Sequence, residues 1–142
     1  MFYEPKNGSP FKIDPFKSLI FPRPIGWISS ISKNGIANLA PYSYFNAVAD
    51  EPPQVMFCSN GSSIHGKYKD SLSNILTTKE FVVNFATSTS RNQMNISSRD
   101  FKPDEDEFIL SNLKKKKSRL VKAPSVKDSP VNLECKLVKT IK

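Results

Sequence analysis

The alternation of apolar and polar positions predicts short β-strands along much of the chain. Residues 25–32 (IGWISSIS) alternate as a half-buried strand does, with Trp27 and Ser29 on one face. An Asn-Gly dipeptide follows at 34–35, and this pair best supplies the positive φ of a two-residue hairpin turn. With a return strand expected over residues 36–41, the pattern predicts a β-hairpin.

The rest of the chain reads as further short strands with two small helices between them. Asp70 or Ser71 can cap the first helix, because carboxylate and hydroxyl oxygens accept the free N–H groups of a first turn. The run PDEDE is expected to be an exposed acidic turn. The predicted strands cover residues 54–59, 81–86 and 131–141. The first predicted helix runs from its cap to about Thr78, and the second covers residues 91–98. The acidic turn covers residues 103–107.

The segment PYSYFNAVADEPP (residues 41–53) is aromatic and polar together, which is typical of neither a plain strand nor an amphipathic helix. We interpret it as backbone that passes a ligand. Because helices do not follow each strand in turn, the element order favours a β-barrel over a doubly wound sheet. The chain has no GxGxxG and no GxxxxGK[ST] motif, so neither common nucleotide-binding loop is predicted.

The length of 142 residues fits one domain with one hydrophobic core. No apolar run approaches the roughly 20 residues that span a bilayer. The N-terminal segment is interrupted by Pro5, Pro10 and Pro15 and carries acidic residues, unlike a signal peptide. We therefore expect a soluble cytoplasmic protein with no membrane partner.

The cysteines and the histidine offer little chemistry. Cys58 and Cys135 lie in apolar runs without a CxxC spacing, so we expect buried, reduced thiols and regard a disulfide or a catalytic thiol as the lesser alternatives. His65 is the one histidine. No metal site is predicted, because no cluster of metal ligands surrounds it in the sequence.

Positive charge is concentrated near the end of the chain. Residues 1–110 carry no net charge, and residues 111–142 carry the whole formal charge of +8, with Lys114–Lys117 as its centre. One interpretation is a patch for nucleic acid or an anionic membrane. We favour a solvated loop and expect no nucleic-acid partner, because no aromatic residues interleave with the lysines.

Several stretches resemble the flavin reductase-like family, to which flavoredoxin belongs. They are RPIGWISSISKNGIANLAPYSYFNAVADEPPQVMFC, KDSLSNILTTKEFVVNF, DEFILSNL and SPVNLECKL, in that order. The resemblance implies an FMN-binding split barrel, mainly β with small helices and Greek-key-like, and a homodimer with FMN where the two barrels meet. Family members usually continue beyond the last stretch. Residues 1–142 are therefore expected to form a single domain that lacks the family's C-terminal strands.

The resemblance also suggests which residues hold the cofactor. Lys69 and Ser71, at a predicted helix start, offer an ammonium, a hydroxyl and the positive end of the helix dipole to the FMN phosphate; an ordinary cap beside an unrelated lysine is equally plausible. Ser29 and Asn38 can meet the ribityl chain, and Trp27 can lie near the ring or fill the core. The candidate cofactor-binding residues are Trp27, Ser29, Asn38, Pro41, Tyr42, Ser43, Tyr44, Phe45, Asn46, Lys69 and Ser71.

The implied activity is that of an NAD(P)H-dependent flavin oxidoreductase, with hydride passing from the nicotinamide to the flavin. A non-enzymatic FMN-binding electron carrier is the alternative. No catalytic side chain is predicted, because the cofactor carries the chemistry while the protein supplies binding and orientation. The choice between NADH and NADPH, and between flavin as substrate and as prosthetic group, stays open.

Overall fold

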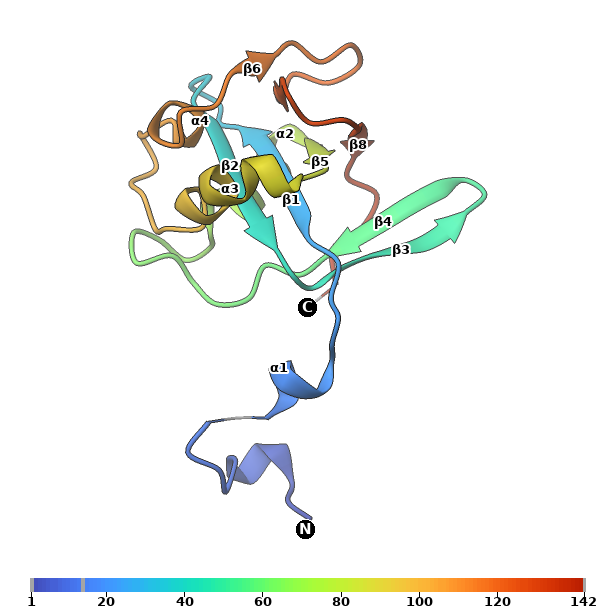
Figure 1. Cartoon of the computed structure of the whole chain (residues 1–142), viewed down its shortest axis with the longest axis vertical. Coiled ribbons are helices and arrows are strands. Elements are labelled where there is room, and N and C mark those ends of the chain that lie inside the picture. The colour runs from blue at the N-terminus through green and yellow to red at the C-terminus, as the bar shows by residue number, and fades with distance from the viewer. Residues whose placement is uncertain (1, 14, 142) are drawn as a thin grey trace.

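The centre of the molecule is a four-stranded antiparallel sheet in the order β2-β1-β5-β8 (Figure 1). The structure, a computed structural model, describes residues 2–13 and 15–141. It confirms a mainly β chain with small helices. The strands of this sheet are β1 (Gly26–Ile31), β2 (Ala37–Tyr42), β5 (Glu80–Asn84) and β8 (Asn132–Lys136).

The predicted hairpin of β1 and β2 is confirmed, but its turn differs. Ser32 N–H donates to Ile36 O (2.9 Å) and Gly35 N–H donates to Ser32 O (3.0 Å), so the loop holds three residues and not two. Gly35 has φ of 82° and Asn34 does not have positive φ. A tight turn followed by a left-handed glycine is the usual three-residue hairpin loop.

A second hairpin, β3 (Phe45–Asp50) with β4 (Pro53–Phe57), projects from the sheet (Figure 1). The strand predicted over 54–59 is confirmed as β4. The expectation that residues 41–53 form no plain strand is wrong: Pro41 and Tyr42 end β2, and residues 45–50 form β3. That strand is exposed beyond Phe45, so it has no buried face to impose the alternation by which strands are recognised.

Both predicted helices are present, as α2 and α3. The expected cap of α2 is wrong: Asp70 and Ser71 lie inside the helix, and Lys69 occupies the cap position without a side-chain hydrogen bond. The longest of the described helices has nine residues, and none could cross a membrane. The helices are η1 (Pro5–Asn7), α1 (Phe16–Leu19), α2 (Asp70–Thr78), η2 (Ser88–Ser90), α3 (Arg91–Ile96) and α4 (Glu107–Leu110).

The sheet buries apolar side chains on both faces. On one face Trp27 packs with Leu39, Phe108 and Val126. On the other face Ile28 belongs to a cluster that includes Ile75 of α2. Since neighbouring strand residues point to opposite faces, Trp27 and Ile28 belong to different clusters. The second cluster consists of Ile28, Tyr42, Ile75, Phe81 and Val83, with Phe45, Val55 and Phe57 packed against it.

Gly26 lets the projecting hairpin dock on the sheet. A Cβ atom at Gly26 would lie 2.6 Å from Cδ2 of Phe45, which is closer than carbon atoms can pack. The Phe45 ring therefore covers the backbone of β1 at the one residue of that strand that leaves room for it. This contact links the second hairpin to the α2 side of the core.

The basic segment is tied to the sheet through its backbone. Backbone N–H groups of Arg119 and Leu120 donate to the Glu134 carboxylate, and that of Lys122 donates to Glu80 Oε2 (2.9 Å). The bonds from Arg119 and Leu120 lower the pKa of the Glu134 carboxyl. The short strands β6 (Lys115–Lys116) and β7 (Ser125–Val126) pair within this segment, and the side chains of β6 are exposed.

Two expectations near the cysteines are wrong. Cys58 is exposed, because it follows the projecting strand β4 and not a core strand. The strand predicted over 131–141 ends at Lys136. Cys135 lies within it, half-buried against the α2-side cluster, and burial raises the pKa of its thiol to about 11. Both thiols are free.

Asn84 joins β5 to three other parts of the chain. Its Nδ2 donates to Trp27 O and to Ser29 Oγ, both at 3.0 Å. Its Oδ1 accepts from Val126 N–H (2.8 Å) and from Asn132 Nδ2 (2.9 Å). All four hydrogen-bonding positions of this fully buried amide are thereby satisfied.

We expect Asn84→Ala to lower the free energy of unfolding by about 3 kcal/mol, because it leaves buried donors and acceptors without partners. Asn132→Ala is the matched control: it removes one bond at a half-buried position and should cost about 1 kcal/mol. Urea unfolding followed by circular dichroism measures both. Equal losses for the two variants would contradict a central role for Asn84.

Candidate functional site

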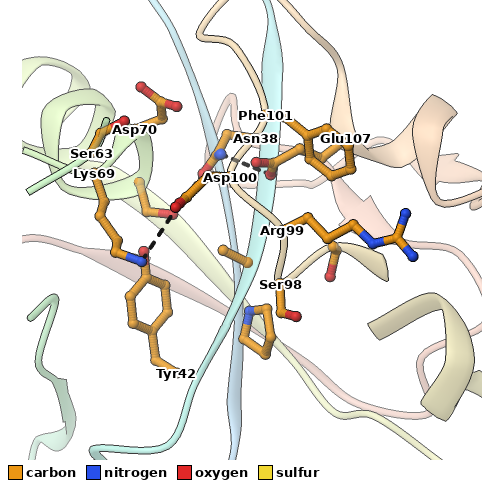
Figure 2. A pocket seen from close by; sticks show the side chains of 14 residues that line it. Asn38, Tyr42, Ser63, Lys69, Asp70, Ser98, Arg99, Asp100, Phe101 and Glu107 are labelled. Atoms are coloured by element: carbon orange, nitrogen blue, oxygen red, sulfur yellow. Dashed lines mark hydrogen bonds and ion pairs between the residues drawn. The ribbon is translucent and has the colours of Figure 1, made fainter. Parts of the chain in front are cut away.

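A small pocket opens at the outer edge of β2, beside the start of α2 (Figure 2). Its volume is about 50 Å³, enough for a group of a few atoms and too little for a three-ring system. The segment that follows α3, residues 97–101, forms another wall, and Glu107 of α4 is also part of the lining. Parts of the chain far apart in sequence therefore meet here.

Two cations line the pocket. Lys69 Nζ lies 3.9 Å from Asp100 Oδ1, a loose ion pair between half-exposed side chains. Arg99 is exposed, and within the described residues its guanidinium has no ion-pair partner. Both groups can therefore turn to an incoming anion without breaking a strong internal bond.

Serine hydroxyls accompany the two cations. Ser63 and Ser98 line the pocket with them. Ser71 is buried, and its hydroxyl donates to Asn38 Oδ1 at 2.6 Å. Cations together with hydroxyl groups form the donor set that a phosphate group requires.

Asn38 connects this donor set to an acid behind it. Its Nδ2 donates to Glu107 Oε2 at 2.7 Å, drawn as a dashed line in Figure 2. The backbone N–H of Leu39 donates to the same carboxylate oxygen. Asn38 Oδ1 accepts from Ser71 and, at 3.3 Å, from Ser30 Oγ. Glu107 thus covers part of the outer edge of β2 and fixes the Asn38 amide.

Glu107 corrects the prediction of an exposed acidic turn over 103–107. The turn is exposed at its start, but Glu107 is only 5% exposed. It is the first residue of α4, and the next residue, Phe108, is fully buried in the core. Burial raises the pKa of the Glu107 carboxyl to about 8, and the negative charges of Asp70 and Asp106 act in the same direction. The hydrogen bonds from Leu39 and Asn38 oppose that rise. At neutral pH the carboxyl is mostly protonated.

Two further residues of the pocket lining have raised pKa values. Burial raises the pKa of Asp70, with His65 lowering it and Asp100 raising it further. Burial likewise raises the pKa of the Tyr42 hydroxyl. Among the described residues, no group of three or more His, Cys, Asp or Glu side chains is placed to hold a metal ion.

The structure brings five of the eleven candidate residues together in this pocket: Asn38, Pro41, Tyr42, Lys69 and Ser71. Trp27 and Ser29 are instead fully buried in the core. Trp27 Nε1 donates to Ser97 Oγ (2.9 Å), and Ser29 Oγ donates to Pro124 O (2.6 Å).

The remaining four candidates, residues 43–46, continue from the pocket toward the projecting hairpin. Tyr44 is half-buried, with the Arg23 guanidinium 5.5 Å from its ring centre. Phe45 covers Gly26. Asn46 is exposed, and its Oδ1 accepts from Ala47 N–H (3.0 Å). Among the described residues its Nδ2 donates to no acceptor.

Sequence reasoning missed Ser63, Ser98, Arg99 and Glu107. The Ser-Ser-Arg run after α3 was a visible signal, since hydroxyls beside a cation favour phosphate. Glu107 gave no such signal, because a run of four acids predicts solvent exposure.

A family model described as "Flavin reductase like domain" matches residues 18–142. An uncharacterised protein of Aquifex aeolicus is 46% identical over 123 residues, which cover 87% of this chain and 62% of that protein. The chain thus spans about three fifths of the length of this curated relative. The match confirms the resemblance noted in the sequence.

Solved structures share the fold. Nitrilotriacetate monooxygenase component B from Bacillus cereus is 32% identical with a TM-score of 0.86, covering 98% of this chain and 69% of its own. A Shewanella frigidimarina protein with a split barrel domain has 22% identity and a TM-score of 0.72, covering 82% of this chain and 56% of its own. The predicted split-barrel fold is confirmed.

The raised pKa of Glu107 makes stability depend on pH. Between the ordinary value of 4.5 and about 8, the unfolded chain has released this proton while the folded protein keeps it, so the free energy of unfolding falls as pH rises. The contribution is at most about 1.4 kcal/mol per pH unit. Urea unfolding from about pH 5 to about pH 8 should show a flatter profile for Glu107→Gln than for the unmodified chain. Asp104→Asn, which removes an exposed charge from the same turn, should keep the original slope; a slope unchanged in Glu107→Gln would contradict the assignment.

Proposed function

The chain belongs to the flavin reductase-like family, and on that premise we propose that it binds FMN, with the phosphate in the pocket beside Lys69, and acts as an NAD(P)H-dependent flavin oxidoreductase. The observation that carries the proposal is the donor set of the pocket. Lys69, Arg99, Ser63 and Ser98 surround a space of about 50 Å³, which suits a phosphate group. These four residues come from three separate segments of the chain.

The remainder of the cofactor would follow the chain from the pocket toward the second hairpin. Pro41 and Tyr42 line the pocket, and the segment Ser43–Asn46 comes next. There the half-buried Tyr44 ring offers a flat apolar face, and Asn46 Nδ2 offers a donor to a polar ring edge. These are the groups that an isoalloxazine ring requires at its face and at its edge.

The surroundings of the pocket favour FMN over FAD. A neighbouring cavity of about 310 Å³ shares Asn38 and Asp70 with the phosphate pocket. Asp104 and Glu105 line it together with a single cation, Lys102. A second phosphate placed there would meet more negative than positive charge, so the monophosphate is the better fit.

The oxidoreductase assignment follows from what a flavin contributes. A bound flavin would accept a hydride equivalent from a reduced nicotinamide nucleotide, and the protein supplies binding, orientation and electrostatics. The residues of this chain would then hold the phosphate and leave a ring face open to the nucleotide. The similarity to a monooxygenase component supports a redox role.

A homodimer is part of the proposal. The second hairpin carries exposed apolar side chains, Val48 at 53% and Met56 at 48% exposure. Phe21, between α1 and β1, is 86% exposed. Figure 1 shows the N-terminal arm with α1 leading away from the sheet. Association of two copies would remove such surface from water at about 25 cal/mol per Å².

Lys69→Ala should weaken FMN binding by about 1.5–3 kcal/mol, the usual contribution of a hydrogen bond to a charged group. Lys67→Ala is the control, because Lys67 is exposed and lies outside the pocket lining. Fluorescence titration with FMN measures both dissociation constants. If the two variants bind alike, Lys69 does not hold the phosphate.

NADH and NADPH oxidation by the FMN-loaded protein tests the activity. We expect consumption of at least one nucleotide above the rate of free FMN, because the site would hold the flavin for transfer. Binding of FMN without nucleotide oxidation would favour the electron-carrier alternative, and absence of FMN binding would refute the proposed function as a whole.

A further inference from the structure

Glu107 is a buried acid without a counter-charge. Its carboxylate accepts two N–H groups, from Asn38 and Leu39, but among the described residues no cation forms an ion pair with it. The nearby Lys115 pairs with Asp106 instead. Burying an unpaired carboxylate is costly, and such a group avoids the cost by holding a proton.

The hydrogen bonds indicate where that proton lies and what it preserves. Oε2 of Glu107 already accepts two N–H groups, so the proton belongs on Oε1. The Asn38 amide is held with Nδ2 toward Glu107 and Oδ1 toward Ser71 and Ser30. Glu107 therefore sets the orientation of a chain of polar groups that ends at the pocket wall.

The charges around the pocket are nearly balanced, and Glu107 decides the balance. The lining includes Lys69 and Arg99 as cations and Asp70 and Asp100 as carboxylates. Asp106 is outside the pocket lining and pairs with Lys115. Tyr42 is a neutral hydroxyl at neutral pH, because burial raises its pKa. With Glu107 ionised, the lining carries three acids against two cations, so a dianionic phosphate would enter a negative site.

Resting on the proposed function, we propose that Glu107 is a positioning residue for the flavin phosphate, and that the pocket accepts a dianionic phosphate only while Glu107 is protonated. The proton removes the charge that would repel the phosphate and leaves Asn38 and Ser71 in place. Phosphate binding and proton uptake are thereby coupled, since each favours the other.

This coupling has a definite sign. The free protein loses the Glu107 proton near pH 8, and a bound dianion holds the proton to higher pH. Above that point the binding of FMN requires proton uptake, so its dissociation constant should rise about tenfold between pH 7 and pH 9. The phosphate is a dianion over this range, because its second pKa is about 6.

The test is FMN titration of the full chain from about pH 7 to about pH 9, with riboflavin as the ligand that lacks the phosphate. The unmodified chain should lose FMN affinity about tenfold, and riboflavin affinity should stay level. Glu107→Gln keeps a neutral acceptor toward Asn38 and should bind FMN with no dependence on pH. Asp104→Asn, an exposed change in the same turn, should retain the tenfold loss.

A measurement on the unmodified chain guards against a variant that misfolds. Titration calorimetry with FMN near pH 8.5, in two buffers of different ionisation enthalpy, should show uptake of between half a proton and one proton, about the share a single titrating group contributes. No proton uptake, equal pH dependence for FMN and riboflavin, or a tenfold loss that persists in a folded Glu107→Gln would overturn the role of Glu107. Failure of the unmodified chain to bind FMN at any pH would overturn the proposed function and this role with it.

Discussion

A polar side chain that a sheet buries must find its partners inside the protein, because no water reaches it. In this molecule two asparagines of one sheet, Asn38 on β2 and Asn84 on β5, supply many of these partners. Asn84 satisfies backbone and side-chain groups of β1, β7 and β8. Asn38 satisfies Glu107 of α4, Ser71 of α2 and Ser30 of β1. The elements that surround the sheet are located by these amides as much as by apolar packing.

The same requirement connects the fold to the pocket. Asn38 lies on the strand at the outer edge of the sheet, where backbone N–H groups would otherwise need water. Glu107 accepts one of them from Leu39 and the amide of Asn38 beside it. The residue that closes the sheet edge is thus also a wall of the pocket. Stability and site chemistry share one carboxyl group, and changes to it affect both.

The sequence predicted those features that local pattern controls. Alternation found β1 and β8, the Asn-Gly turn indicated β2, and short apolar runs found β4 and β5. Helical spacing found α2, in which Ile75 is buried. It failed where a distant contact decides. The strand β3 is mostly exposed, so its sequence lacks the alternation that marks a half-buried strand. Cys58 lies in an apolar run that is typical of the core, but it is exposed because it follows the projecting hairpin. The sequence predicts an exposed Glu107, because no neighbouring residue indicates that Asn38 and Leu39 of β2 require a hydrogen-bond acceptor.

Lys69, Ser71 and the segment from Pro41 were identifiable because they resemble a family pattern, whereas Arg99 and Ser98 enter the pocket through a loop whose path only the structure gives. The basic segment 114–127 differs from the pocket in how its charges are used. Glu134 and Glu80 bind its backbone N–H groups and not its ammonium groups. Of the run Lys114–Lys117, Lys115 is paired with Asp106, and the other ammonium groups form no ion pair among the described residues. The path of this segment therefore depends mainly on hydrogen bonds of its backbone. The electric field of its free ammonium groups in solvent is screened by salt, with a Debye length of about 10 Å at 0.1 M.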